Sequence, residues 1–465
     1  MIAIVDYGAG NPASVARALE ALGYPGRITA DPTEVGAAEK VILPGVGHFG
    51  ALMAALDARG LRAVLQRVLA GGRPFLGICI GLQVLYEGSE EAPGCPGLGV
   101  WPGMVRRFPA GPKVPHTGWA EVTGLRPSRL LAGCGLEPSF YFTHAYFVPP
   151  DARTTYVGHY PGAFIAAAEA DAIFGVQFHP EKSAALGRLV LENFVTLPRA
   201  AAVAIPPRPH PRTEPYRRII PCLDVHAGRV VKGVQFAALR DSGDPAALAA
   251  AYDAAGADEL ALLDISASRE GRNTLLETVA AVARQLRIPL LAGGGVASLA
   301  DGERLLAAGA DKVTVNTAAA LQPRLVTQLA QAFGSQAVVV AVDARRDGAA
   351  WRVFTHGGHH ATERDAVEWA REAESLGAGE ILLTSMDRDG TREGFDTALS
   401  AAVSAAVQIP VIASGGGGQA GDFAAVLQPG GADAALAASI FHTGDLSPLG
   451  LKQHLAAAGV PVRMA

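Results

Sequence analysis

The stretch "FLGICIGLQVL" holds one cysteine, Cys79, between glycines where an apolar segment changes to a helical pattern. Glycines on both sides indicate close backbone approach, so we expect a tight strand-to-helix elbow here. A thiol next to a base or a helix N-terminus forms a thiolate, which is a strong nucleophile. A small buried cysteine is the alternative for this residue taken alone.

A candidate base for that nucleophile lies in "GVQFHPEKS", where Glu181 follows His179 by two residues. In an extended chain this spacing puts both side chains on one face, so Glu181 can orient and polarise the imidazole. Cys79, His179 and Glu181 then complete a nucleophile–base–carboxylate triad. His179 alone is equally explained as a capped loop residue before proline.

An oxyanion donor for the same site is available in "LPGVGHFG". The run Gly45-Val46-Gly47 can turn a backbone N–H toward the negative charge that develops on a substrate carbonyl.

Two aspartates, Asp224 in "CLDV" and Asp343 in "AVDA", each follow a strand-like apolar run. Paired carboxylates across a pocket suit general acid–base chemistry, although strand-end aspartates more often cap helices. Glycine runs at 293–295 and 415–417 would let backbone N–H groups approach phosphate oxygens. Their twofold recurrence predicts a ligand that carries phosphate at both ends.

The elements around Cys79 alternate between short apolar strands and helical windows. "MIAIVDYG", "KVILPGVG" and "RPFLGIC" each run into a glycine turn, and patterns such as "NPASVARALEALG" follow. Later segments such as "SFYFTHAYF" are typical of hairpins. We expect residues 1–197 to form an α/β sandwich with a mostly parallel sheet and some antiparallel strands.

A connector follows, because residues 198–215 contain six prolines and almost no periodic apolar pattern. Residues 216–465 then show eight strand-like segments, each followed by a helical window, which predicts a (β/α)8 barrel. This half also repeats itself: "AGADELALLDI" matches "LGAGEILLTSM" and "IPLLAGGG" matches "IPVIASGG". Both pairs are 121 residues apart (376 − 255 and 409 − 288), which indicates a duplicated half-barrel.

Composition narrows the function classes. A formal net charge of −5 over 465 residues gives no electrostatic reason to expect nucleic acid or an anionic membrane as a partner. Four cysteines without a CxxC pair favour a reducing, cytoplasmic location. We expect neither metal nor cofactor, since no cluster has metal-ligand spacing and no dinucleotide fingerprint occurs in context.

The motifs "LPGVGHF", "GICIGLQ", "VPHTGW" and "GVQFHPEKS" together resemble a class I (triad) glutamine amidotransferase. Residues 1–197 are most similar to the glutaminase subunit of imidazole glycerol phosphate synthases. The resemblance implies glutamine hydrolysis through a thioester on Cys79, with contacts to glutamine from Gln83 and the 45–47 strand. In "THAYF", Ala145 replaces a residue that usually bears a hydroxyl, which leaves one substrate contact open.

The rest of the chain resembles the cyclase subunit of the same synthases, through "LRDSGDP", "AGADKVTVNT", "GAGEILLTSMDRDGT" and "ADAALAASIFH". The related isomerase of histidine biosynthesis is also a duplicated barrel, but "CLDV" and the fused glutaminase favour the cyclase. A fused synthase of this kind passes ammonia to the barrel, where phosphoribulosyl-formimino-AICAR-phosphate becomes imidazole glycerol phosphate and AICAR. The resemblance implies that six further residues line that substrate: Asn316, Thr384, Asp389, Gly390, Ser414 and Ser439. We also expect substrate contacts from Asp264, Gly295 and Gly416, and Lys232 can neutralise substrate charge, with a solvated surface lysine as the alternative.

Four charged residues at or near strand starts, Arg218, Glu259, Lys312 and Glu380, can form a ring of alternating charge. One interpretation of the ring is a network of ion pairs that stabilises the base of the barrel. The resemblance implies instead a gate for ammonia that passes from the glutaminase domain to the cyclase domain, which are partners within one chain. The rival to the whole interpretation is a non-catalytic metabolite-binding protein derived from these domains. The five intact catalytic candidates argue against it.

Overall fold

The computed structural model describes residues 1–8, 11–135, 137–197, 213–226, 228–234, 237–265, 267, 276–428 and 431–464, with the backbone alone at 232–234 and 237–242. The expected connector lies outside the described residues from 198 to 212. The chain divides into two compact units. The first holds Met1–Pro112, His116–Pro215 and Ala332–Gly334, and the second holds Lys113–Pro115, Tyr216–Gln331 and Ser335–Ala465.

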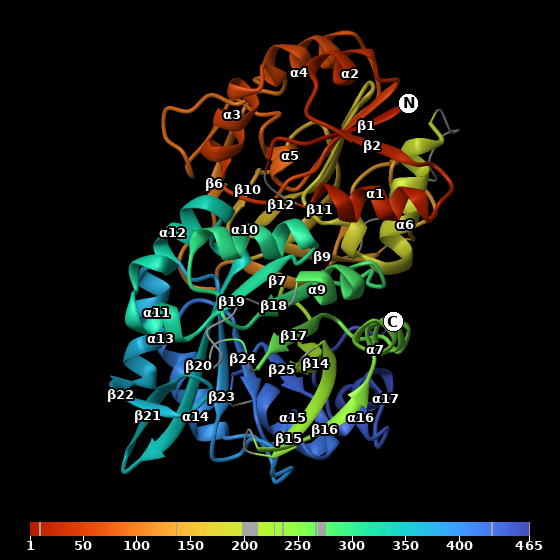
Figure 1. Cartoon of the computed structure of the whole chain (residues 1–465). Coiled ribbons are helices and arrows are strands. Elements are labelled where there is room, and N and C mark those ends of the chain that lie inside the picture. Colours follow the sequence, from red (N-terminus) through yellow and green to blue (C-terminus); the bar gives the residue numbers. More distant parts are fainter. Residues whose placement is uncertain are drawn as a thin grey trace. The chain divides into compact units, whose positions relative to one another are not determined.

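The first unit is built on an eight-stranded sheet, whose parallel part holds the amino-terminal strands (Figure 1). The parallel strands, in spatial order, are β2 (Gly26–Thr29), β1 (Ile2–Val5), β3 (Lys40–Leu43), β4 (Phe75–Ile78) and β13 (Ile173–Val176). The antiparallel continuation is β12 (Ala163–Ala170), β11 (Thr154–His159) and β8 (Thr123–Gly124). The predicted α/β fold with antiparallel material is confirmed.

Helices accompany the sheet: α1 (Pro12–Glu20), α2 (Pro32–Ala37), α3 (Phe49–Ala58), α4 (Leu61–Ala70), α5 (Ile80–Gln83) and α6 (Ala184–Val195). The start of α1 follows from its sequence, because the Asn11 side chain accepts from the N–H of Ser14 and proline occupies the first turn. Its apolar stripe buries Val15 and Leu19.

Two smaller sheets complete the first unit. One pairs β7 (His116–Glu121) with β9 (Ser139–His144), and the other joins β5 (Gly88–Ser89), β6 (Met104–Arg107) and β10 (Tyr146–Phe147). The segment "SFYFTHAYF", expected to form hairpins or edge strands, forms β9 and β10, which lie in different sheets: β9 pairs with β7, and β10 is the edge strand beside β6, so this segment is not itself a hairpin.

The second unit contains the predicted barrel of eight parallel strands. These strands are β14 (Arg218–His226), β17 (Leu260–Asp264), β18 (Leu290–Gly293), β19 (Lys312–Val315), β20 (Val338–Asp347), β23 (Glu380–Ser385), β24 (Val411–Ser414) and β25 (Ala434–Ala437). The sheet closes because β14 pairs in parallel with β25 as well as with β17. The barrel is confirmed.

The described helices of the barrel include α7 (Pro245–Ala254), α9 (Leu276–Ala283), α10 (Leu299–Ala308), α11 (Thr317–Leu321), α12 (Arg324–Phe333), α13 (Ala366–Ser375), α14 (Thr397–Ala406), α15 (Ala420–Leu427), α16 (Ser439–His442) and α17 (Pro448–Ala457). The sequence analysis missed a hairpin in each half, β15 (Arg229–Val234) with β16 (Ala237–Gly243) and β21 (Ala350–Thr355) with β22 (His360–Asp365). Each hairpin follows the first strand of its half-barrel, so the two hairpins occupy equivalent positions in the internal repeat.

The barrel interior is layered along its strands. Alternate residues of a strand share a face, so β14 presents one series inward: Arg218, Ile220, Cys222 and Asp224. The middle layers pack as one apolar cluster, formed by Ile220, Cys222, Ala261, Leu291, Val339, Leu382, Ile412, Ala434 and Leu436. This apolar cluster separates the charged side chains at the strand starts from Asp224 and Asp343, which lie toward the strand ends. Among the described helices, no segment has the length and apolar character that a membrane span needs.

Candidate active sites

Cys79 lies in the elbow between β4 and α5 with φ 53° and ψ −108°, a conformation that non-glycine residues rarely adopt. The flanking glycines are required by close backbone approach. A Cβ on Gly77 would lie 2.3 Å from the Gly81 carbonyl oxygen, and one on Gly81 would lie 2.2 Å from the carbonyl oxygen of Leu43. Because α5 has only four residues, it supplies the N-terminal dipole of a single turn.

His179 and Glu181 are brought together, but not by the extended chain that we expected. Pro180–Lys182 form a 3₁₀ turn, and this turn carries Glu181 back so that its Oε1 lies 2.9 Å from Nδ1 of His179. Burial alone would lower the pKa of His179, but the charges of Cys79 and Glu181 outweigh it and raise the pKa well above its ordinary value. Among the described residues, no partner meets hydrogen-bond geometry at His179 Nε2, but the Cys79 sulfur is close enough to contribute to the raised pKa of the ring. The raised pKa of His179 favours an imidazolium next to Cys79 near neutral pH.

A glutamine that the sequence analysis missed contacts the thiol. Gln177 Nε2 donates to Cys79 Sγ at 3.4 Å, and Gln83 Nε2 donates in turn to Gln177 Oε1 at 3.1 Å and to the Tyr146 carbonyl at 2.9 Å. The position of Gln177 two residues before His179 was the available signal. Gln83 lies in the site, and its contact with glutamine stays a prediction.

The run Gly45–Gly47 lies directly against the elbow, since a Cβ on Gly45 would be 2.6 Å from the Gly81 nitrogen. Gly47 has φ 118°, which favours glycine. The Val46 N–H donates to the Tyr7 hydroxyl at 3.3 Å, and that hydroxyl donates to the Val46 carbonyl at 2.9 Å. Of the three backbone N–H groups in the run, that of Val46 is therefore bonded to Tyr7 in this conformation, and the oxyanion donor stays a prediction.

The barrel contains a cavity of about 500 Å³, into which the strand ends project. Eleven of the predicted residues line it: Asp224, Asp264, Gly295, Asn316, Asp343, Thr384, Asp389, Gly390, Ser414, Gly416 and Ser439. Lys232 belongs to β15, and its side chain lies outside the described residues. The lining also includes residues that the sequence analysis did not assign to the site, among them Cys222, Thr317 and His356.

The two aspartates of this cavity have different protonation properties. Burial, reinforced by the charge of Asp389, raises the pKa of Asp224 to about 7, against a weak hydrogen bond from Cys222 Sγ at 3.3 Å. Burial also raises the pKa of Asp343, to about 6, where a 2.7 Å hydrogen bond from Asn316 Nδ2 limits the rise. Near neutral pH Asp224 can supply a proton and Asp343 is mostly ionised, which is a suitable acid–base pair.

The glycine runs lie on opposite sides of the barrel, after β18 and after β24, four strands apart in the strand order. Gly294 has φ 106°, and a Cβ there would be 2.2 Å from the Asp264 carbonyl oxygen. Gly416 has φ 105° and is equally close to the carbonyl oxygen of Gly394. Glycines of both turns line the cavity and have no side chain to cover the backbone. The backbone N–H groups of each turn can therefore approach one phosphate group closely.

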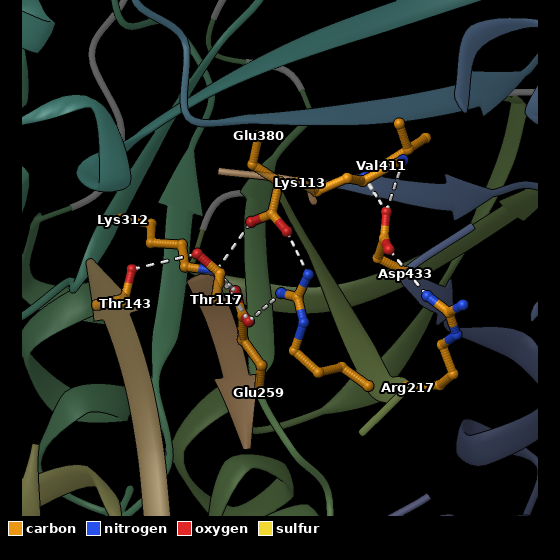
Figure 2. Close-up of polar contacts among 10 residues, drawn as sticks. Lys113, Thr117, Thr143, Arg217, Glu259, Lys312, Glu380, Val411 and Asp433 are labelled. Atoms are coloured by element: carbon orange, nitrogen blue, oxygen red, sulfur yellow. Dashed lines mark hydrogen bonds and ion pairs between the residues drawn. The ribbon is translucent and has the colours of Figure 1, made fainter. Parts of the chain in front are cut away.

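The four charged residues at the strand starts form a closed ring of ion pairs. Figure 2 labels three of the four, Glu259, Lys312 and Glu380. Arg218 contacts Glu259 at 2.8 Å and also pairs with Glu380, while Lys312 lies 3.0 Å from Glu259 and 2.8 Å from Glu380. Burial opposes ionisation of Glu380, but Arg218 and Lys312 outweigh it and lower its pKa. Each charge in the ring is therefore compensated by two opposite neighbours.

No group of three or more histidine, cysteine or acidic side chains that could hold a metal ion occurs among the residues with described positions.

The fold and the two sites define a class of protein. Its members join, in one chain, an α/β sandwich that carries a cysteine–histidine–glutamate group and a (β/α)8 barrel that carries paired aspartates. Comparisons with known proteins agree with this class. The family model "Glutamine amidotransferase class-I" matches residues 3–197, and the model "Histidine biosynthesis protein" matches residues 218–447.

Similar proteins cover the barrel half. The imidazole glycerol phosphate synthase subunit HisF of Geobacillus thermodenitrificans is 61% identical over 249 residues, which are 53% of this chain and 99% of that protein. The HisF subunits of Hyphomonas neptunium and Acidobacterium capsulatum are 61% and 60% identical over 53% of this chain and 98% of each relative. The chain thus belongs to the histidine biosynthesis protein family, with a class-I glutamine amidotransferase domain fused before it.

Proposed function

We propose that this chain is a bifunctional imidazole glycerol phosphate synthase of histidine biosynthesis. It hydrolyses glutamine in the first unit and uses the ammonia to convert phosphoribulosyl-formimino-AICAR-phosphate to imidazole glycerol phosphate and AICAR in the barrel. One observation carries the proposal: a cysteine–histidine–glutamate group and a two-aspartate cavity occur in a single chain whose barrel half is 61% identical to HisF subunits.

In the proposed glutaminase reaction, the Cys79 thiolate attacks the side-chain amide carbon of glutamine and forms a tetrahedral oxyanion. The His179 imidazolium gives its proton to the amide nitrogen, the C–N bond breaks, and ammonia leaves behind a thioester. Neutral His179 then takes a proton from water, whose hydroxide attacks the thioester and releases glutamate. The raised pKa of His179 supports its role as the proton carrier, and Glu181 on Nδ1 orients the ring.

In the proposed cyclase reaction, Asp224 and Asp343 exchange protons with the substrate while the two glycine turns hold its phosphates. The pKa of about 7 for Asp224 and about 6 for Asp343 suits one donor and one acceptor near neutral pH. The remaining cavity residues of the sequence prediction, together with Lys232, are proposed as substrate contacts.

We further propose that ammonia reaches the cavity along the barrel axis through the ring of Arg218, Glu259, Lys312 and Glu380. The apolar layer between ring and aspartates supports this route, because neutral ammonia crosses apolar surroundings more easily than ammonium does. The proposed division of the chain is an amidotransferase domain at 1–197, a connector at 198–215 and a cyclase domain at 216–465. All four cysteines are free thiols, which is consistent with a reducing cytoplasm as the proposed location.

The test separates the two active sites. We expect Cys79→Ala to abolish glutamine-dependent formation of imidazole glycerol phosphate and to leave the reaction with ammonium salt largely intact. Cys134→Ala, which also removes a buried thiol of the first unit, is the matched control and should retain both reactions. A folded wild-type chain that hydrolyses no glutamine and forms no imidazole product from ammonia would instead be a non-catalytic binding protein.

A further inference from the structure

The cavity of the barrel is lined by more acidic than basic side chains. Among the described residues that line it, only His356 and Arg392 have side chains that can carry a positive charge, against four carboxylates: Asp224, Asp264, Asp343 and Asp389. A ligand with phosphate at both ends brings further negative charge into this space, which is costly unless it is compensated. Backbone N–H groups of the glycine turns carry partial charges only, so each phosphate would be bound more tightly with a cationic side chain beside it.

The two residues that can supply this charge share an uncommon backbone conformation. His356 has φ 55° and Arg392 has φ 60°, a region that residues other than glycine seldom adopt. Glycine would adopt it at a lower cost, and two glycines, Gly357 and Gly358, directly follow the histidine. Costly backbone conformations of this kind cluster at ligand sites. The conformation therefore favours a functional role for each of the two side chains.

His356 lies beside the first glycine turn, residues 293–295, which follows β18. Its N–H donates to Oγ1 of Thr317, just after β19, at 2.9 Å. A Cβ on Gly357 would lie 3.9 Å from the carbonyl oxygen of Ile265, just after β17. Because β17 and β19 are the two neighbours of β18 in the sheet, the histidine and this glycine turn lie on the same side of the cavity.

Arg392 lies beside the second glycine turn, residues 415–417. A Cβ on Gly418, the residue after that turn, would lie 2.2 Å from the Arg392 carbonyl oxygen. The guanidinium also pairs with Asp445 at 2.5 Å. Each glycine turn thus has one side chain next to it that can be cationic, which is His356 at the first turn.

The imidazole of His356 is held at one of its two nitrogens. Nδ1 lies 3.1 Å from the Thr355 hydroxyl oxygen, and this hydroxyl donates to the His360 carbonyl oxygen at 3.4 Å. The hydroxyl proton is thereby engaged, so the hydroxyl oxygen accepts from Nδ1–H. An imidazolium donates from both nitrogens, so the ring can keep this bond and donate to an anion from Nε2.

We propose that His356 binds the substrate phosphate at the first glycine turn and supplies the positive charge that the backbone of this turn lacks. The inference rests on the proposed cyclase function and adds a substrate contact that the sequence analysis did not assign. Because ring formation leaves the phosphate groups unchanged, the contact stabilises bound substrate and transition state equally.

His356→Asn tests the contact with little change to the backbone. Asparagine tolerates positive φ, and its shorter side chain keeps a donor near the position of Nδ1 and has nothing at Nε2. We expect KM for phosphoribulosyl-formimino-AICAR-phosphate, measured with ammonium salt, to rise about 10- to 100-fold, the range for a hydrogen bond to a charged group. The change in kcat should be less than about 3-fold, because the lost binding is uniform.

His360→Asn is the matched control. The ring centroids of His356 and His360 are 4.6 Å apart, but His360 is not among the residues that line the cavity. This variant should keep the KM and kcat of wild type.

A second measurement needs no catalysis. In protein labelled with ¹⁵N in its histidine rings, the NMR signals lost in His356→Asn identify His356, and those lost in His360→Asn identify His360. Titration of wild type with inorganic phosphate at constant pH should shift the His356 signals at concentrations that leave the His360 signals in place.

An unchanged KM in His356→Asn, or a loss confined to kcat, would overturn the binding role of His356. So would phosphate that shifts neither histidine, or that shifts both histidines equally. If the wild type forms no imidazole product from ammonium salt, the proposed cyclase function fails, and the phosphate titration alone then decides whether His356 binds phosphate.

Discussion

Glu181 Oε1 lies 2.9 Å from His179 Nδ1, and a single 3₁₀ turn between the two residues produces this contact. The turn places a buried carboxylate against the ring nitrogen that does not face the thiol, so the imidazole has one defined orientation. Both side chains are almost fully buried, which strengthens their electrostatic interaction.

Glu181→Gln should lower the pKa of His179, because it removes one of the two charges that raise that pKa. Less imidazolium at neutral pH and a poorly oriented ring should reduce kcat/KM for glutamine by about 10²–10⁴. Glu192→Gln, the same charge change on α6, is the control. Glutaminase assays from pH 6 to 9 check this, and equal profiles for Glu181→Gln and wild type would show that the glutamate is not part of the triad.

Asp224→Asn and Asp343→Asn should each slow ring formation by about 10²–10⁴ with either nitrogen source, since each removes a positioned proton donor or acceptor. The glutaminase reaction of the same variants is an internal control for folding. Cyclisation assays with ammonium salt, corrected for the fraction of free ammonia at each pH, provide the measurement. Normal cyclisation in both variants would disprove the carboxylate assignment.

Asp224 should also make stability depend on pH. Its folded pKa of about 7 lies above the ordinary 3.8, so the folded state binds the proton more tightly than the unfolded state does. The resulting stabilisation is complete below pH 4 and is lost as pH rises toward 7. Asparagine does not titrate, so Asp224→Asn lacks this loss. The free energy of unfolding of Asp224→Asn minus that of wild type should rise by about 3 kcal/mol between pH 5 and pH 8.

Urea denaturation of wild type and Asp224→Asn at both pH values tests this expectation, with Asp347→Asn at the exposed end of β20 as control. A constant difference across this range would mean that Asp224 titrates normally in the folded protein.

Lys312→Ala should separate glutamine hydrolysis from product formation. It opens the ring and leaves Glu259 and Glu380 with Arg218 alone, so one buried negative charge is uncompensated. We expect less imidazole product per glutamine consumed, measured as the ratio of glutamate to imidazole glycerol phosphate.

Lys452→Ala controls for the loss of a buried lysine, because Lys452 pairs with Asp258 from α17 rather than from a barrel strand. It should lower stability and keep the ratio at one. A ratio of one in a folded Lys312→Ala variant would leave the ring with a structural role only.

The sequence by itself determined the elements and the residues that end them. The glycines beside Cys79 predicted an elbow because glycine permits close backbone approach, and the 121-residue repeat predicted two equivalent half-barrels with an aspartate on the first strand of each. These features depend on local steric requirements and on hydrophobic periodicity, and both can be read from the amino-acid sequence.

Other properties depended on groups far apart in the chain, and only the tertiary structure decided them. Gln177 contacts Cys79 across 98 residues of chain, and Tyr7 contacts Val46 across 39 residues, and only the folded chain brings these pairs together. The pKa difference between Asp224 and Asp343 comes from burial, Asp389 and different hydrogen-bond donors, Cys222 and Asn316. The His179–Glu181 contact also depended on the backbone conformation. A spacing of two residues can bring these side chains together in an extended strand or in a 3₁₀ turn, and only the structure shows that it is a 3₁₀ turn.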